Sequence, residues 1–83
     1  MDIEFDSIKD ALNIEKHGLS LTRILDLENI VVVQDDRFAE PRLRLYGMLD
    51  GQPHCAAITI RGDIFRLISL RRAHAKEYRR HVR

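Results

Sequence analysis

The segment from residue 42 to residue 70 constrains the fold most, because two turn signals divide it into stretches in which polar and apolar residues alternate. Asp50-Gly51 is typical of a β-hairpin, and Gly62-Asp63 turns the chain again. Antiparallel strands joined by such short turns form a meander. The expected strands cover residues 42–49, 53–61 and 64–70.

The first half of the chain predicts a strand, two short helices and a second strand. Residues 2–5 alternate between polar and apolar types, and residues 30–34 are rich in β-branched residues, which favour strands. Asp6 and Ser20 suit the N-cap of a helix, and Gly18 suits the residue that ends one. Because only a few residues join the two helices, we expect a helical hairpin.

Both helices are expected to be amphipathic, with their apolar sides packed inward. In the first helix the polar side then holds Asn13, Lys16 and His17. The apolar residues are Ile8, Ala11, Leu12 and Ile14 in the first helix, and Leu21, Ile24, Leu25 and Leu27 in the second.

The end of the sequence predicts a basic helix from about residue 72 to residue 81. Residues 61–83 contain eight Lys or Arg against two acidic residues, whereas residues 1–60 contain six against eleven. This end of the chain attracts polyanions, although a solvated helix face explains the same charges without any function. The elements together predict one α+β domain over residues 1–83, an antiparallel meander with a helical hairpin before it and a basic helix after it.

Several classes of protein do not fit the sequence. No apolar run approaches the roughly 20 residues that cross a bilayer, and the acidic N-terminus lacks the pattern of a signal peptide. We therefore expect a cytoplasmic protein without membrane association. Cys55 is the single cysteine, and the adjacent His54 has no partners at ligand spacing, so no disulfide, metal ion or other cofactor is expected.

Pairing and alternation predict which face each strand residue occupies. Antiparallel pairing about the first turn places residue 42 roughly opposite residue 59, so Arg42 and Arg61 share a face if this register holds. Regular alternation in the last strand divides its residues into Arg66 and Ile68 on one face and Leu67 and Ser69 on the other.

The aromatic residues are few. Phe5, Phe38 and Phe65 are expected to pack in the core. Tyr46 suits either the core or a role in base stacking, since aromatic rings stack on the bases of single-stranded RNA.

Three blocks of the sequence resemble the BrnT family in order and spacing, and together they cover nearly the whole chain. The blocks are Phe5-Asp6 with Lys9, Asn13 and Lys16-His17-Gly18, then Arg42, Gly47 and Asp50-Gly51, and finally Arg66 to Ala73 followed by Glu77. The departures from the family pattern are Leu70, where a small residue is common, Tyr78, where arginine is common, and His81, where tyrosine is common.

The resemblance implies a RelE-like fold and the activity of a type II toxin, an endoribonuclease that cleaves RNA without a metal ion or a ribosome and so inhibits translation and growth. It also implies a partner, a DNA-binding BrnA-like antitoxin that neutralises the toxin. The resemblance further implies that the toxin reaches operator DNA only through its complex with this antitoxin. Two alternatives share the same basic surface, a catalytically inactive co-repressor that acts with its antitoxin and an RNA-binding domain unrelated to toxins. Growth arrest on expression without a partner would favour the enzyme.

Metal-free cleavage of RNA requires a base for the 2′-OH, a cation for the charge that builds up on the phosphate group and an acid for the departing 5′ oxygen. Arginine suits the second role, since its planar guanidinium group matches two phosphate oxygens. With the resemblance, Arg66 and Arg71 are candidate catalytic residues, and Glu77 is a base or the group that positions an arginine. The alternative for Glu77 is a surface ion pair with Lys76 or Arg80.

His17 is the fourth candidate catalytic residue. It lies at the C-terminus of the first expected helix, where the helix dipole favours a protonated imidazole, and this suits an acid more than a base. The alternative is a histidine that only caps the helix. The candidate RNA contacts are Lys16, Arg42, Arg61, Arg72, Lys76 and Arg79.

Overall fold

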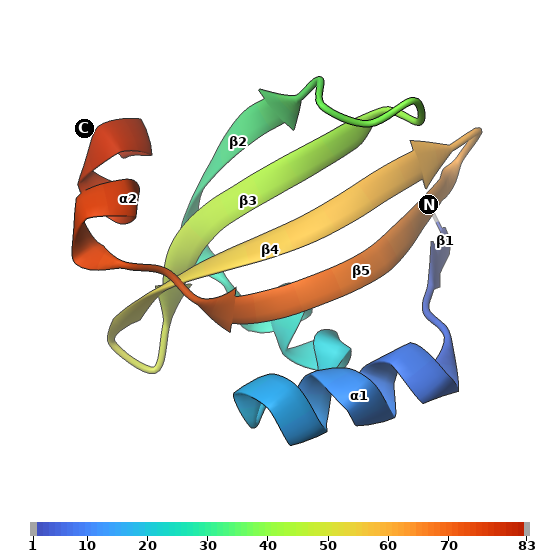
Figure 1. Cartoon of the computed structure of the whole chain (residues 1–83), viewed down its shortest axis with the longest axis horizontal. Coiled ribbons are helices and arrows are strands. Elements are labelled where there is room, and N and C mark those ends of the chain that lie inside the picture. Colours follow the sequence, from blue (N-terminus) through green and yellow to red (C-terminus); the bar gives the residue numbers. More distant parts are fainter. Residues whose placement is uncertain (1, 83) are drawn as a thin grey trace.

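The computed structural model describes residues 2–82 and follows the predicted order of elements (Figure 1). Asp6 accepts a hydrogen bond from the Ile8 N–H at 2.7 Å, and Gly18 has a φ of 74°, so both ends of the first helix form as predicted. The elements are β1 (Asp2–Glu4), α1 (Ser7–His17), η1 (Leu21–Asp26), β2 (Glu28–Asp35), β3 (Arg42–Leu49), β4 (Gln52–Arg61), β5 (Ile64–Arg72) and α2 (Ala75–His81).

The five strands form one mixed sheet in the order β1-β5-β4-β3-β2. Strands β2 to β5 are the predicted antiparallel meander, and Arg42 lies opposite Thr59 as the hairpin turn requires. The prediction of an antiparallel sheet is wrong for β1, which pairs in parallel with β5. Both helical segments separate β1 from the meander, so no hairpin turn imposes antiparallel pairing on it.

The second helix is a 3₁₀ helix, so the predicted helical hairpin is wrong in its second member. Ser20 caps it by accepting from the Thr22 N–H, and the Leu27 N–H bonds to the Ile24 carbonyl with the i to i+3 spacing of a 3₁₀ turn. The predicted inward side chains Leu21, Ile24 and Leu27 are buried, but Leu25 is exposed.

The first helix packs with the side opposite to the one predicted. Ile8 and Leu12, expected to face inward, are 70% and 57% exposed, whereas Asn13 is 6% exposed. The Asn13 amide donates to the carbonyls of Leu19 and Leu70 at 2.7 and 2.9 Å and accepts from the Leu70 N–H at 3.1 Å. Hydrogen bonds to main-chain groups of β5 and of the turn that follows α1 therefore decide which side of α1 faces the sheet.

Strand β5 contains a bulge at Ile68, which has no partner on β4. Consecutive residues of β4 pair with Ser69 and Leu67, so one residue of β5 is extra. Regular alternation was therefore the wrong expectation for this strand. Arg66, Ser69 and Arg71 all lie on one face, while Leu67 points into the core.

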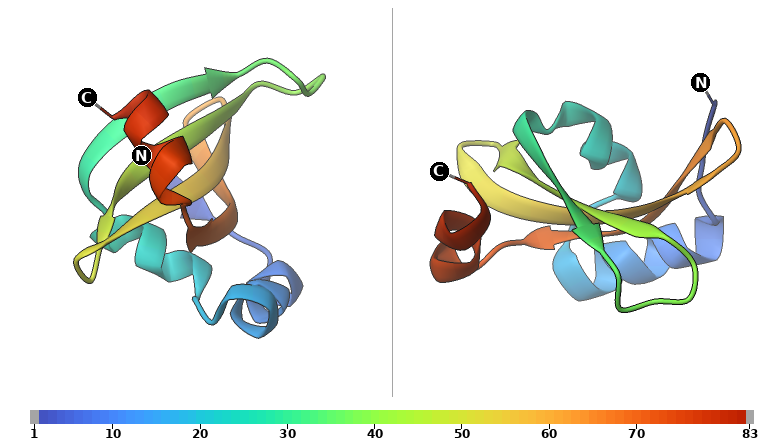
Figure 2. Two further views of the ribbon diagram at one scale, coloured as in Figure 1. Left: turned by 60° about the vertical axis from the view of Figure 1, so that its left-hand side comes forward. Right: turned by 90° about the horizontal axis from the view of Figure 1, so that it is seen from above.

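The sheet is strongly twisted, and its two faces differ (Figure 2). One face packs against α1 and η1, and α2 lies over the other, which we call the open face, where β5 ends. Tyr46 is fully buried on the open face, and its ring stacks on His81 at 4.8 Å between centroids. Phe5 and Phe38 are 40% and 43% exposed, so core packing was wrong for both, whereas Phe65 packs against the core as predicted.

Candidate active site

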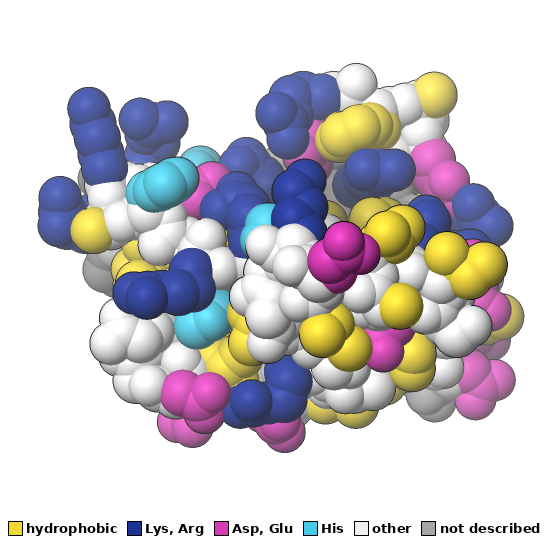
Figure 3. Space-filling model, turned by 60° about the horizontal axis from the view of Figure 1, so that its bottom comes forward, with side chains coloured by type: hydrophobic (Ala, Val, Ile, Leu, Met, Phe, Trp, Pro, Cys, Tyr) yellow, Lys and Arg dark blue, Asp and Glu magenta, His cyan; other side chains and the backbone are white. Residues whose placement is uncertain are grey.

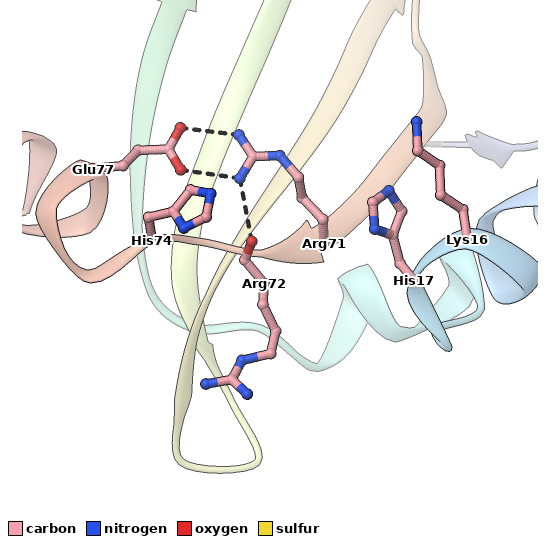
Figure 4. A pocket seen from close by; sticks show the side chains of 6 residues that line it. All are labelled: Lys16, His17, Arg71, Arg72, His74 and Glu77. Atoms are coloured by element: carbon pink, nitrogen blue, oxygen red, sulfur yellow. Dashed lines mark hydrogen bonds and ion pairs between the residues drawn. The ribbon is translucent and has the colours of Figure 1, made fainter.

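A cleft of about 490 Å³ lies between the end of α1, the end of β5 and the start of α2 (Figure 4). The end of α1 is distant in the sequence from β5 and α2, which follow one another, so the cleft exists only in the folded chain. Five of its six lining residues are ones that the sequence singled out. The six are Lys16 and His17 from α1, Arg71 and Arg72 from β5, and His74 and Glu77 from the segment that begins α2.

Arg71 and Glu77 form a bidentate ion pair at one side of the cleft (Figure 4). Arg71 Nη1 donates to Glu77 Oε1 at 3.0 Å, and Nη2 donates to Oε2 at 2.9 Å. The Tyr46 hydroxyl donates to the same Oε2 at 3.1 Å and accepts from Arg44 Nη1 at 2.9 Å. A bidentate pair fixes the plane of the guanidinium group, so Arg71 is held in one orientation.

Glu77 acts on its neighbours through its negative charge. The predicted alternative of a surface pair with Lys76 or Arg80 is wrong, because the carboxylate pairs with Arg71. The hydrogen bonds from Arg71, with a smaller contribution from Tyr46, lower the pKa of Glu77 to about 2. Such a weakly basic carboxylate is a poor proton acceptor near neutral pH, and its bidentate contact with Arg71 suits the positioning of that arginine.

The Glu77 pair has a testable dependence on pH. Because the folded-state pKa lies below the unfolded value of 4.5, the charge of Glu77 stabilises the fold above pH 4.5, and this contribution is lost as pH falls toward 2. We expect Glu77→Gln to lower the free energy of unfolding by about 1–2 kcal/mol at pH 7 and by much less at pH 2.5, as measured by urea unfolding of both proteins. A difference that stays constant across this range would contradict the charge-dependent pair.

His17 lies opposite Arg71 in the cleft, and its protonation differs from the prediction. Partial burial, followed by the positive charges of Lys16 and Arg71, lowers the pKa of His17. The expectation that the helix terminus keeps this imidazole protonated is therefore wrong, since burial and two nearby cations favour the neutral ring. A neutral imidazole can accept a proton, so the lowered pKa suits a base more than an acid.

The basic residues near α2 point in different directions. Arg72 lines the cleft, but its guanidinium group turns away and donates to Gln52 Oε1 at 2.8 Å (Figure 4). Lys76 and Arg79 are exposed on α2. These residues present positive charge around the cleft without contacting Arg71 through their side chains.

Other predicted residues lie along the open face. Arg66 pairs with Glu4 at 3.0 Å, and five residues of strand, about 15 Å, separate it from Arg71. Arg61 pairs with Glu40 at 2.6 Å. The structure therefore does not bring Arg66 into the cleft with the other candidate catalytic residues. Arg42 lies across β4 from Arg66 and lines a second hollow, which Arg71 also lines.

Three residues of the site were not singled out for these roles from the sequence. Arg44 and Tyr46 follow Arg42 by two and four residues, so alternation along β3 puts all three on one face, and this spacing is the signal that could have found them. His74 lies three residues after Arg71, at the N-cap of α2. The approach of α2 to Tyr46 depends on the fold and leaves no local pattern in the sequence.

Basic and hydrophobic side chains each gather in one region of the surface. Lys, Arg and His side chains surround α2, whereas exposed hydrophobic side chains gather over α1 (Figure 3). Within residues 2–82, no group of three His, Cys, Asp or Glu side chains is placed to hold a metal ion. In the same part of the chain, no helix combines the length and the hydropathy that a membrane span requires.

Comparison with known proteins identifies the family. The family model for the ribonuclease toxin BrnT of type II toxin–antitoxin systems matches residues 5–77. The 1.1 Å crystal structure of the Brucella abortus ribonuclease toxin BrnT is similar, with a TM-score of 0.70 and 28% sequence identity, and the match covers 89% of this chain and 97% of that one. No curated protein matches the chain in sequence. The chain belongs to the BrnT family of ribonuclease toxins of type II toxin–antitoxin systems.

Proposed function

We propose that this protein is a cytoplasmic endoribonuclease toxin that cleaves single-stranded RNA without a metal ion or a ribosome and thereby inhibits translation and growth. The observation that carries the proposal is Arg71, whose guanidinium group Glu77 holds in an open cleft that also contains two histidines. A fixed cation and two imidazoles can supply the cation, the base and the acid that metal-free cleavage requires. The proposal places the fold among the RelE-like nucleases.

Four side chains of the cleft and the buried Tyr46 have roles in the proposed mechanism. His17 takes the proton of the 2′-OH, the 2′ oxygen attacks phosphorus, and the bond from phosphorus to the 5′ oxygen breaks. Arg71 stabilises the negative charge that builds up on the phosphate group. His74 gives a proton to the 5′ oxygen, so the products carry a 2′,3′-cyclic phosphate and a 5′-OH. Glu77 positions Arg71, and Tyr46 positions Glu77.

The RNA is held by basic side chains around the cleft and along the open face. Each of these side chains neutralises a phosphate and so raises the affinity for RNA, and this contribution decreases as the salt concentration rises. Arg66 belongs to this group in the proposal, since it lies away from the reacting phosphate. The proposed contacts are Lys16, Arg42, Arg61, Arg66, Arg72, Lys76 and Arg79.

The family implies an antitoxin protein as partner. We propose that a BrnA-like DNA-binding antitoxin neutralises this toxin by placing an acidic segment over the cleft, and that their complex binds operator DNA and represses its own operon. Lys16, Arg71 and Arg72 attract carboxylates for the same reason that they attract phosphates.

The proposed activity is tested with purified protein and a defined single-stranded RNA, in EDTA and without ribosomes. We expect cleavage that leaves a 2′,3′-cyclic phosphate and that stops when the nucleotide before the cut is replaced by its 2′-deoxy form. His17→Ala is expected to lower the rate at least 100-fold, since general bases contribute about 10²–10⁴-fold. No cleavage by a protein shown to be folded would contradict the proposal and favour a co-repressor that acts only with its antitoxin.

A further inference from the structure

A second hollow of about 200 Å³ lies on the open face next to the cleft. Arg71 lines both, so the two hollows adjoin at this side chain. Ala57 and Ser69 lie opposite each other on β4 and β5, and their small side chains leave the hollow open at its centre. A chain bound with one phosphate at Arg71 therefore has room for its next unit here.

Phe38, which was predicted to pack in the core, lines this hollow instead. Phe38 is 43% exposed, in the loop between β2 and β3. The Arg42 guanidinium carbon lies 3.9 Å from the centroid of the Phe38 ring, and that of Arg37 lies 5.6 Å away. The Arg42 guanidinium group lies over one face of the ring, and a nucleobase can stack on an outer side of this Phe38–Arg42 stack, because bases stack on aromatic rings and on arginine alike.

The charges of the hollow favour an anion. Arg37 donates to both oxygens of Asp35, at 2.9 and 2.7 Å, and Arg44 Nε lies 3.7 Å from the same carboxylate. Asp35 is 5% exposed, and hydrogen bonds from Arg37, with the nearby charge of Arg44, hold its pKa well below the usual range. The negative charge of Asp35 is therefore neutralised by these two arginines. Arg42 forms no ion pair among residues 2–82. Its positive charge is available to a phosphate group.

We propose that this second hollow binds the nucleotide next to the scissile phosphate, with its base stacked on the Phe38–Arg42 pair and its phosphate against Arg42. The proposal rests on the proposed function, because it takes the cleft at Arg71 as the place of cleavage. It makes Phe38 a residue that determines affinity and base preference. A protein segment with carboxylates would use Arg42 but would gain little from an exposed phenyl ring.

The test measures binding of a labelled 2′-O-methyl hexanucleotide, which lacks the 2′-OH and is not cut. Phe38→Ala is expected to weaken binding roughly 10-fold, because stacking on one base contributes about 1–3 kcal/mol. Arg42→Gln is expected to weaken binding and to lower the slope of log affinity against log salt by about 0.7, the value for one phosphate contact in a single strand. Phe38→Ala should leave that slope unchanged.

Two matched variants serve as controls. Phe5→Ala removes a phenylalanine of similar exposure, 40%, that lines neither hollow, and Lys9→Gln removes an exposed positive charge from α1. Both are expected to bind the oligonucleotide as the wild type does. Circular dichroism confirms that each variant is folded.

The outcomes separate this proposal from the proposed function. If the wild type cleaves RNA but Phe38→Ala and Arg42→Gln bind as tightly as it does, the second subsite is overturned and the nuclease stands. If both variants bind more weakly while the wild type cuts no RNA, the nucleotide-binding site at Phe38 and Arg42 is supported, whereas the nuclease, and with it a position next to a scissile phosphate, is overturned. A wild type that binds no RNA overturns both.

Discussion

Arg71→Ala is expected to lower kcat for RNA cleavage by about 100- to 1000-fold. The loss follows from removing the cation that stabilises the charged phosphate group, and comparable donors in other enzymes contribute this much. It also leaves Glu77 without its partner and adds an unpaired negative charge to the cleft. The measurement is single-turnover cleavage of a defined RNA at saturating enzyme, with a parallel unfolding curve to show that the variant is folded.

Two further variants sharpen this result. Arg71→Lys keeps the charge but loses the planar fork that pairs with Glu77 and with a phosphate, so we expect an intermediate loss of rate. Lys9→Gln removes one exposed positive charge that does not line the cleft and is expected to leave the rate within a few-fold of the wild type. Retention of full activity by Arg71→Ala would place the reaction elsewhere on the molecule.

Asn13→Ala is expected to destabilise the fold by about 2–4 kcal/mol. The change deletes three hydrogen bonds and leaves the main-chain N–H and carbonyl of Leu70, and the carbonyl of Leu19, without these partners. Each buried polar group that loses its partner costs about 1–3 kcal/mol. Urea unfolding at pH 7 measures the effect as a shift in the midpoint at an unchanged m-value.

The matched control is Leu12→Ala, one residue earlier on the same helix. This change removes a larger apolar side chain, but one that is 57% exposed, and we expect it to cost less than about 1 kcal/mol. A conventional amphipathic helix would give the opposite order. If Leu12→Ala proved the more damaging of the two, the orientation of α1 described above would be incorrect.

Features fixed by short-range geometry were predicted well from the sequence. The turn at Asp50-Gly51 set the register of β3 against β4, and the caps at Asp6, Gly18 and Ser20 set the limits of the helical segments. Each of these depends on a few neighbouring residues whose backbone preferences are strong.

Features that depend on distant partners were not predicted. Asn13 appears polar and solvent-facing in the helix pattern, and its burial becomes clear only when β5 lies beside α1. Phe38 appears to be a core residue, although its loop holds it at the rim of a hollow. In both cases contacts between elements override the preference of the residue type.

The candidate site was predicted in part. The sequence grouped Lys16, His17, Arg71, Arg72 and Glu77 as candidates, and the cleft brings these five together. Their roles changed, because the pKa directions of His17 and Glu77 follow from burial and from Arg71, which no spacing reveals. Their assignment to catalysis and RNA binding stays a prediction for the experiments above.

The bulge in β5 has a consequence for how the length of this strand can vary among relatives. Arg66 and Arg71 are five residues apart. In a regular strand this spacing would place their side chains on opposite faces, yet both lie on the open face. A relative that lacks Ile68 would keep every other side chain of β5 on its present face, because only the unpaired residue is lost. A one-residue deletion in a regular part of the strand would turn one segment over. Position 68 is therefore where evolution can insert or delete a single residue here at low cost.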